Sequence, residues 1–316
     1  MFDGVKSAIS APHVKVVTAP LYNSNADFER DEAWLSTAVN DNGGDVFVST
    51  QHTMPNALLS PTVKTVVLLH DLTPEIYEWG WLVKKRVVER ATEIVGVSET
   101  TIEKYYEHYG KREGVRAVAS RNGVDTSVFY RRERGEGEQF LIVVGNRGGY
   151  KSGHTLFLTL KAMCAKSDSI CPELVLVGGG DVTAEERERF AGVSVRQVGN
   201  VSDESLAGLY SNAFALVFLS LDEGFGLPVA EAMACGCQLI LSDISVFREV
   251  VGRGYAAGGV QFVNPGSMDE ISAAIITAAS ERGQQRGGLV AESRARFGAG
   301  WEVLSGHLWE ALRRKE

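Results

Sequence analysis

Short, wholly apolar segments recur along the 316-residue chain and alternate with amphipathic ones. The clearest of them is Phe140-Leu-Ile-Val-Val144, in which every side chain is apolar. A strand with one face in water alternates apolar and polar residues, whereas a strand that is buried on both faces is apolar throughout. Strands that alternate with helices build parallel sheets. The chain is therefore expected to be an α/β protein with doubly wound parallel sheets.

The expected strands are rich in Val and flanked by turn residues. They span His13–Ala19, Asp45–Ser49, Thr65–Leu69, Ile94–Val97, Phe140–Val144, Leu174–Val177, Val193–Val198, Ala215–Leu219, Gln238–Leu241 and Val260–Val263. Helices are expected at Leu82–Ile94 and Glu99–Tyr109. The segment Ser267-Met-Asp-Glu270 fits a capping box that opens a helix through Ala279.

A charged segment, Arg131–Glu138, has no apolar residue and is the expected linker between two domains. Residues 1–133 would form a short N-terminal Rossmann-like domain, and residues 134–296 a second Rossmann-like domain. Residues 297–316 would form a terminal helix that could cross back to the first domain. Ligands of open α/β sheets bind beyond the carboxyl ends of the strands, so a cleft between the two domains is the expected place for a site.

Charge and cysteine content exclude several classes of protein. The net charge of -8 disfavours nucleic-acid binding, which depends on neutralising phosphates. No apolar stretch approaches the ~20 residues that span a bilayer, and Met1–Pro20 lacks the apolar core of a signal peptide, so a cytoplasmic protein is expected. Cys164, Cys171, Cys235 and Cys237 form no C-x-x-C pair and are expected to be reduced thiols.

The segment Glu223-Gly-Phe-Gly-Leu-Pro-Val-Ala-Glu231 follows an expected strand and opens an expected short helix. Pro228 suits the first position of that helix, and Gly236 suits its left-handed exit. Gly224 and Gly226 remove side chains just before the helix. A ligand could therefore approach the backbone N–H groups at the positive helix end, which favours an anion there.

Two carboxylates flank this helix start. Glu223 lies in the loop, and Glu231 lies about one turn inside the helix. Both could accept hydrogen bonds from sugar hydroxyl groups. A tight loop with two solvated acids is the alternative interpretation.

Further candidate residues follow two other expected strands. Arg147 and Lys151 come just after one of them and could clamp a diphosphate and stabilise the charge that develops as it leaves. An ordinary basic loop is the alternative. His70 ends another apolar strand, where a loop would enter the cleft, although it could also be a satisfied core histidine. Asp71 could cap the next helix rather than take part in chemistry.

Several other types of site are disfavoured, because the sequence lacks residues that they require. Gly145–Ser152 nearly matches a P-loop, but Tyr150 stands where the P-loop needs a glycine that lets the backbone wrap the phosphate. No G-x-G-x-x-G segment occurs, which disfavours a nicotinamide enzyme. Gly96–Thr100 lacks the second glycine of a nucleophile elbow.

Taken together, these motifs resemble the retaining family-4 glycosyltransferases of the GT-B fold, a group with many bacterial mannosyl- and glucosyltransferases. The resemblance rests first on Glu223 and Glu231, which are separated by seven residues inside Glu-Gly-Phe-Gly-Leu-Pro. The other similar segments, in the order typical of the family, are His70–Leu72, Val97–Glu99, Asn122–Asp125, Val144–Arg147 with Lys151, Ala232–Gly236 and Ser242–Glu249.

The resemblance implies two doubly wound Rossmann-like domains that face each other across a cleft, the first of them reduced. It also implies roles for individual residues. Glu223 would contact the donor sugar, His70 would touch the sugar near the reacting carbon, and Arg147 and Lys151 would hold the diphosphate. The implied donor-binding residues are Glu231 at the nucleotide ribose, with Gly224, Phe225, Gly226, Leu227, Gly145, Asn146 and Gly179.

The implied activity is transfer of a hexose from a nucleotide diphosphate sugar to a hydroxyl of a glycan or lipid-linked acceptor, with retention of configuration. His70–Glu75 is similar to mannosyl- and rhamnosyl-type members, which favours GDP-mannose and leaves UDP-sugars open. No cofactor and no metal is expected, since there is no Asp-x-Asp motif. Two alternatives stay open: another GT-B enzyme such as a nucleotide-sugar epimerase, and a non-catalytic nucleotide-sugar-binding subunit.

Two features concern partners. Trp79-Gly-Trp81 followed by Lys84-Lys-Arg86 could touch an anionic membrane surface, and a solvated helix face is the alternative. The opening strand and Gly-rich loop of the family cannot be placed before His13. The chain could therefore be a compact natural variant, a truncated chain, or a subunit that borrows the missing surface from a second copy or a partner.

Overall fold

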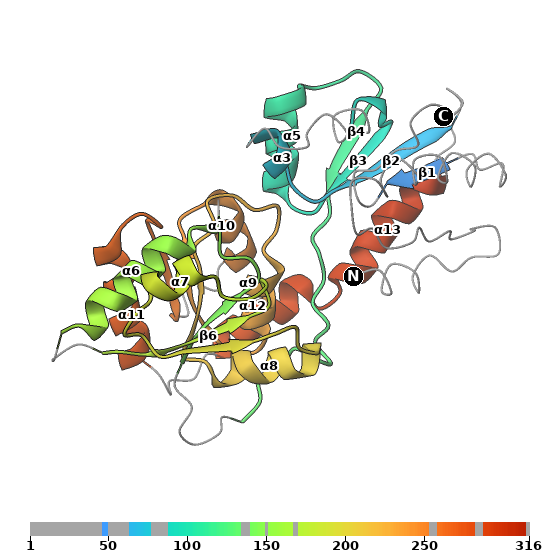
Figure 1. Cartoon of the computed structure of the whole chain (residues 1–316). Coiled ribbons are helices and arrows are strands. Elements are labelled where there is room, and N and C mark those ends of the chain that lie inside the picture. Colours follow the sequence, from blue (N-terminus) through green and yellow to red (C-terminus); the bar gives the residue numbers. More distant parts are fainter. Residues whose placement is uncertain are drawn as a thin grey trace. The chain divides into compact units, whose positions relative to one another are not determined.

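The computed structural model describes residues 46–49, 63–76, 88–133, 140–148, 151–166, 170–252, 258–281 and 287–313. The chain divides into two compact units (Figure 1). The first is Met1–Gly123 together with Ala299–Glu316, and the second is Val124–Gly298. Within the described residues each unit holds one parallel sheet, with four strands in the first unit and six in the second.

The sheet of the first unit has the strand order β1-β2-β3-β4, and every neighbouring pair is parallel. Its strands are β1 (Val46–Ser49), β2 (Lys64–Leu69), β3 (Glu93–Gly96) and β4 (Arg116–Ala119). Its helices with described bounds are α3 (Thr73–Ile76), α5 (Glu99–Tyr109) and α13 (Gly300–Arg313), and residues 88–90 are helical as well. The expected strands β1, β2 and β3 are found within one residue of their expected bounds, whereas β4 was not expected.

One expected helix is wrong at its C-terminal end. Leu82–Ile94 was expected to be helical, but Glu93 and Ile94 belong to β3. The Glu93 carboxylate is buried and forms ion pairs with Lys64 at 3.4 Å and Arg116 at 2.7 Å on the two neighbouring strands. These cross-strand contacts fix the segment as a strand. The expected strand His13–Ala19 and the Trp79–Arg86 segment lie outside the described residues.

The terminal helix α13 belongs to the first unit. It packs on β2 and β3, and Lys64 Nζ of β2 donates a hydrogen bond to the carbonyl oxygen of Ala311 at 2.7 Å. The apolar stripe of the helix is buried, because Leu304 and Leu308 are fully enclosed. The last helix of the chain therefore completes the core of the unit that contains its first described residues.

The sheet of the second unit has the strand order β10-β9-β8-β5-β6-β7. Its strands are β5 (Phe140–Val144), β6 (Glu173–Val177), β7 (Val195–Val198), β8 (Ala215–Phe218), β9 (Gln238–Ser242) and β10 (Val260–Val263). Its helices are α6 (Gly153–Cys164), α7 (Ala184–Arg189), α8 (Asp203–Asn212), α9 (Leu227–Ala234), α10 (Ser245–Val251), α11 (Met268–Ser280) and α12 (Gly287–Phe297). All six strands were expected, with small differences at their ends.

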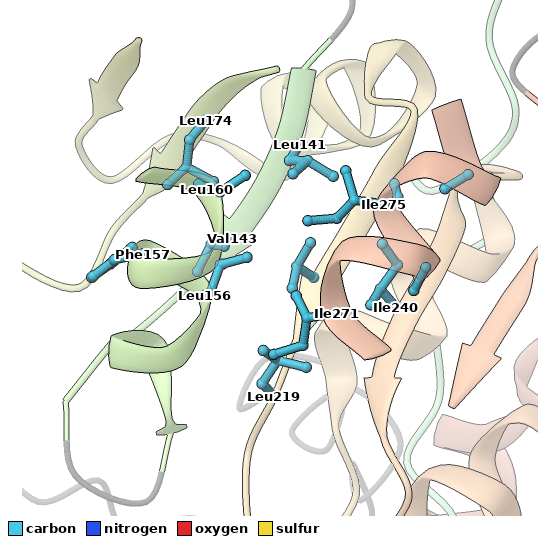
Figure 2. Packing of buried hydrophobic residues seen from close by; sticks show 14 of the residues in the cluster. Leu141, Val143, Leu156, Phe157, Leu160, Leu174, Leu219, Ile240, Ile271 and Ile275 are labelled. Atoms are coloured by element: carbon cyan, nitrogen blue, oxygen red, sulfur yellow. The ribbon is translucent and has the colours of Figure 1, made fainter. Parts of the chain in front are cut away.

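Both faces of this sheet are covered. Leu141 and Ile142 are neighbours in β5 and point to opposite faces, yet neither side chain has any exposed surface. On one face, Leu141 packs with Leu160 of α6 and Ile275 of α11 (Figure 2). Burial on both faces is the physical reason for the uninterrupted apolar run of β5.

The strand order contains one reversal. From β5 the chain builds β6 and β7 on one side, and it then returns to place β8 on the other side of β5. In doubly wound sheets, the loops after the two strands at such a reversal part to opposite faces and leave a crevice between them. The fold therefore directs a ligand to the carboxyl ends of β5 and β8.

The boundary between the units lies earlier than the expected one at residue 133. The start of the expected linker is tied to the second unit, since the Arg132 backbone N–H donates to Ser211 Oγ at 3.3 Å and its Nη1 donates to the Glu204 carbonyl oxygen at 2.8 Å. These contacts with α8 make residues up to 133 part of the second unit. The rest of the expected linker lies outside the described residues.

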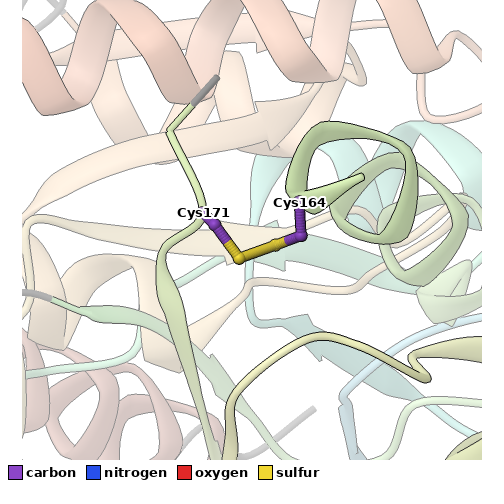
Figure 3. The surroundings of a disulfide bond; sticks show 2 residues. All are labelled: Cys164 and Cys171. Carbon is purple, nitrogen blue, oxygen red and sulfur yellow. A yellow bond between two sulfur atoms is a disulfide. The ribbon is translucent and has the colours of Figure 1, made fainter. Parts of the chain in front are cut away.

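The cysteines differ from the expectation of four reduced thiols. Cys164, at the end of α6, and Cys171, just before β6, form a disulfide (Figure 3). Cys235 and Cys237 are buried free thiols. Burial raises the pKa of Cys235 to about 12, so this thiol is uncharged and unreactive at neutral pH.

Candidate functional site

Three loops follow the central strands of the second sheet at their carboxyl ends. The described residues 145–148 and 151–152 follow β5, residues 178–183 follow β6, and residues 219–226 follow β8. Because β5 lies between β6 and β8, these loops are neighbours. Most of the residues that the sequence singled out lie in these three loops and in the helix that follows the third.

Lys151 and Glu223 meet at the reversal of the strand order. Lys151 follows β5, Glu223 follows β8, and Lys151 Nζ forms an ion pair with Glu223 Oε1. The side chains are 16% and 14% exposed, so ligands can still reach both groups. Lys151 Nζ also lies 5.2 Å from the centre of the Phe218 ring, which favours a cation at that place.

Arg147 has a different environment from Lys151. Its side chain is 3% exposed, and its Nε donates to Glu186 Oε1 at 3.0 Å. Its Nη1 donates to the Gly178 carbonyl oxygen at 3.0 Å, and its Nη2 donates to the Gly180 carbonyl oxygen at 3.2 Å. Arg147 therefore faces the loop after β6 rather than Glu223. A cavity of about 20 Å³ beside Arg147 and Lys151 has room for one water molecule.

The loop after β6 begins with three successive glycines in left-handed conformations, with φ of 65° at Gly178, 72° at Gly179 and 76° at Gly180. A Cβ atom on Gly179 would overlap the carbonyl oxygen of Gly145 and lie 2.6 Å from Arg147 Nη1. The predicted residues Gly145 and Gly179 are thus in close contact. Asn146, predicted beside them, is exposed.

Helix α9 begins at Leu227, one residue before the start predicted at Pro228. Gly226 is its N-cap with φ of 88°, and a Cβ there would lie 3.0 Å from the Phe247 ring. Leu227 and Pro228 form the first turn, and Gly236 leaves the helix with φ of 69°. The cap has no side-chain oxygen; its carbonyl oxygen accepts the Val229 N–H at 2.9 Å, and Pro228 has no N–H to donate.

Phe225 contributes its backbone to the loop and its ring to the core. The ring is buried and lies edge-on to Phe297, with the ring centroids 5.5 Å apart. Gly224 is buried in the same loop. The Phe225 ring therefore belongs to the core and does not line the site.

Glu231 lies one turn inside α9 and is paired with a buried tyrosine. The Tyr210 hydroxyl donates to Glu231 Oε2 at 3.3 Å. Burial raises the pKa of Glu231 to about 7; the hydrogen bond from Tyr210 opposes this rise, and the charge of Asp203 adds to it. Tyr210 is fully buried in the core, at the α8 helix whose N-cap is Ser202.

His70 and Asp71 belong to the first unit. His70 follows β2, and Asp71 Oδ1 accepts a hydrogen bond from the Thr73 backbone N–H at 3.0 Å at the start of α3. Asp71 is therefore a capping residue, as the sequence allowed. The contact of His70 with a donor sugar stays a prediction.

Glu186 is the site residue that the sequence analysis missed. It is the third residue of α7, its Oε2 accepts the Thr183 backbone N–H at 3.0 Å, and its carboxylate also binds Arg147. The segment Thr183-Ala-Glu-Glu186 matches a capping box and could have located the helix start. Nothing in the spacing of the sequence indicates the contact with Arg147.

The described residues contain no group of three His, Cys, Asp or Glu side chains placed to hold a metal ion. In the same part of the chain, every helix is too short or too polar to cross a bilayer.

The chain is similar to a known protein family and to several known proteins. The family model of Glycosyl transferases group 1 matches residues 126–299, more than half of the chain. The O-antigen chain mannosyltransferase RfbU of Salmonella typhimurium is 29% identical over 245 residues, which cover 73% of this chain and 65% of that protein. GDP-mannose:cellobiosyl-diphosphopolyprenol alpha-mannosyltransferase of Komagataeibacter xylinus is 39% identical over 101 residues, which cover 30% of this chain and 25% of that protein. The matches span less than two thirds of the length of these relatives.

Among solved structures, sucrose-phosphate synthase from Thermosynechococcus elongatus has a TM-score of 0.72 at 22% identity, and the match covers 95% of this chain and 82% of that one. The expected fold class is confirmed: two α/β units with parallel sheets match those of GT-B glycosyltransferase structures. The family model, the relatives and the fold agree, and the chain belongs to the family Glycosyl transferases group 1.

Proposed function

We propose that the protein is a retaining glycosyltransferase that moves a mannosyl group from GDP-mannose to a hydroxyl of a glycan or lipid-linked acceptor. The observation that carries the proposal is the pairing of Lys151 with Glu223 at the reversal of the strand order, beside the N-terminus of α9. The names of the mannosyltransferase relatives support the choice of sugar, and one of them includes GDP-mannose.

The arrangement suits a nucleotide diphosphate sugar. Lys151 supplies a positive charge for the diphosphate, and the N-terminal end of the α9 dipole adds a partial positive charge. When diphosphate oxygens engage Lys151, the Glu223 carboxylate is released from its ion pair and can accept hydrogen bonds from sugar hydroxyls. Glu231, one turn further into α9, is then assigned to the nucleotide ribose.

Retention follows from attack and departure on the same face of the sugar. The acceptor oxygen bonds to the anomeric carbon as the bond from that carbon to the phosphate oxygen breaks. The acceptor proton passes to the departing phosphate oxygen, so no protein base is required. Lys151 stabilises the negative charge that develops on the leaving diphosphate. His70 is assigned to the donor sugar, and the acceptor is assigned to the first unit.

The experiment is a thermal-shift panel of GDP, UDP, ADP and GDP-mannose, because a ligand that binds only the folded protein raises its stability by about 2.7 kcal/mol at one hundred times Kd. GDP and GDP-mannose are expected to raise the Tm. Lys151→Met should lose most of the GDP effect, whereas Lys161→Met, on the exposed side of α6, should keep it. A protein that none of the four ligands stabilises would contradict the proposal.

Measurements of turnover distinguish a glycosyltransferase from an epimerase and from a binding subunit. Glu223→Gln is expected to abolish sugar transfer and to keep GDP binding, since Glu223 is assigned to the sugar and not to the nucleotide. Conversion of GDP-mannose without an acceptor would instead indicate an epimerase. GDP binding with turnover only after a second protein is added would indicate a binding subunit. Loss of activity in chelator would count against diphosphate binding without a metal.

A further inference from the structure

Arg147 and Lys151 are close in sequence, but only Lys151 lies beside Glu223. All three nitrogens of the Arg147 guanidinium group donate hydrogen bonds to the segment from Gly178 to Glu186. Its Nη2 also lies 3.5 Å from the Asp181 carbonyl oxygen. With 3% of its side chain exposed and its donors engaged, Arg147 could reach a phosphate only by breaking these bonds.

These bonds orient the loop after β6. A trans peptide group directs its C=O and its N–H in opposite directions. The carbonyls of Gly178 and Gly180 point at Arg147, so the N–H groups of Gly179 and Asp181 point away from it. Among the described residues, neither N–H has a hydrogen-bond partner. The loop therefore presents backbone donors on the face opposite Arg147, where an anion can accept them.

Glu186 fixes Arg147 and balances its charge. Its carboxylate accepts hydrogen bonds from Arg147 Nε at 3.0 Å and from the Thr183 backbone N–H at 3.0 Å. Burial raises the pKa of Glu186, but the hydrogen bonds from Arg147 and Thr183 outweigh it and bring the pKa below its ordinary value. The carboxylate is thus ionised at neutral pH. It offsets the positive charge that Arg147 would otherwise offer to a diphosphate.

We propose that Arg147 and Glu186 are positioning residues: they hold the Gly178–Asp181 loop so that its N–H groups face the diphosphate, and Lys151 is the side-chain cation that contacts it. This inference rests on the proposed function. It replaces the expectation that Arg147 clamps the diphosphate directly.

The two roles of Arg147 predict opposite effects of Glu186→Gln. If Arg147 bound the diphosphate, loss of the Glu186 charge would release a cation and strengthen binding. If Arg147 holds the loop, the same change loosens the loop and weakens binding. Because a hydrogen bond to a charged group contributes more than a neutral one, we expect its loss to weaken diphosphate binding about tenfold.

The first measurement is the affinity of the purified chain for GDP and for guanosine, or for UDP and uridine if the wild type prefers uracil. Because the nucleoside lacks phosphate, the ratio of the two affinities reports phosphate binding alone. We expect Glu186→Gln and Arg147→Lys each to lower this ratio about tenfold, since each removes charge-assisted hydrogen bonds. The double variant should lose no more than either single variant, since both residues act through the same loop.

Glu173→Gln is the matched control. Glu173 pairs with Arg196 at 3.3 Å at the start of β6, at the opposite end of the strand from the loop. This variant loses an Arg–carboxylate pair in the same sheet but should keep the wild-type affinity ratio. A stronger preference for the diphosphate in Glu186→Gln would overturn the proposal.

The second measurement is hydrogen exchange in the absence of ligand, at the amides that flank the loop. The Gly178 N–H donates to the Val198 carbonyl oxygen at 3.1 Å, and the Val182 N–H donates to Gln197 Oε1 at 3.3 Å. Both amides should exchange faster in Glu186→Gln and Arg147→Lys. Unchanged exchange would refute the positioning role even if the wild type bound no nucleotide. Failure of the wild type to bind any nucleotide would count against the proposed function alone.

Discussion

Glu231 gives a prediction whose magnitude follows from the structure. Its carboxyl group is buried against Tyr210, and the pKa rises from the ordinary 4.5 to about 7. Between these two values the folded protein holds a proton that the unfolded chain has released. The contribution of Glu231 to stability is therefore fully present below pH 4.5 and is lost as the pH rises through 7.

The expected size of this loss is about 3 kcal/mol, since one pH unit corresponds to 1.36 kcal/mol. The test is the free energy of unfolding in urea, measured without ligand at several pH values between 4.5 and 8, for the wild type and for Glu231→Gln. Glutamine does not titrate, so the wild type should lose about 3 kcal/mol relative to the variant across this range. A difference that is independent of pH, or that grows in favour of the wild type with rising pH, would refute the reasoning.

Tyr210→Phe provides an internal check. The hydrogen bond from Tyr210 lowers the pKa of Glu231, so its removal should move the loss of stability to higher pH. The same carboxylate is assigned to the ribose in the proposed function. GDP binding below pH 7 should then release a proton, which appears as a dependence of the calorimetric enthalpy on the buffer, and Glu231→Gln should abolish that dependence.

Three further substitutions test local features of the second unit. Gly179→Ala should destabilise the protein by at least 1–2 kcal/mol in urea, because the position has a left-handed φ and its Cβ would overlap the Gly145 carbonyl oxygen; wild-type stability would show that the loop can relax. Cys164→Ser should lower the free energy of unfolding by about 2.5 kcal/mol, because the disulfide to Cys171 no longer closes its loop. Dithiothreitol should lower the free energy of unfolding of the wild type by the same amount and leave that of the variant unchanged. Thr183→Ala removes the side-chain cap of α7 and should cost about 1 kcal/mol, and an unchanged urea midpoint would be inconsistent with that cap.

A strand that is buried on both faces is evident from the sequence alone. Phe140–Val144 was expected and is β5, because a central strand without a solvated face carries an unbroken apolar signal. The strand β4, Arg116–Ala119, was not expected. All four of its residues are half-buried, and its first residue is held by an ion pair with Glu93. Among the described strands β4 lies at the edge of its sheet, and its apolar run, Ala117–Ala119, is too short to predict a strand.

The glycines that flank α9 were also recognisable from the sequence. Gly226 opens α9 and Gly236 ends it, since left-handed caps leave a glycine signature in the sequence. The disulfide shows the opposite case. Cys164 ends a helix and Cys171 precedes a strand, and the seven-residue separation matches no pattern that indicates a bond. Their proximity is set by the folding of α6 back onto β6.

The different environments of Arg147 and Lys151 follow from strand order rather than from their own sequence. Both residues follow β5, which pairs with β6 on one side and β8 on the other. Arg147 turns toward the β6 side and meets Glu186, whereas Lys151 turns toward the β8 side and meets Glu223. The crevice of a doubly wound sheet opens at the reversal, which here lies between β5 and β8. Because neighbouring strands are not evident from one sequence, two similar cations in one loop could not be told apart until the sheet order was known.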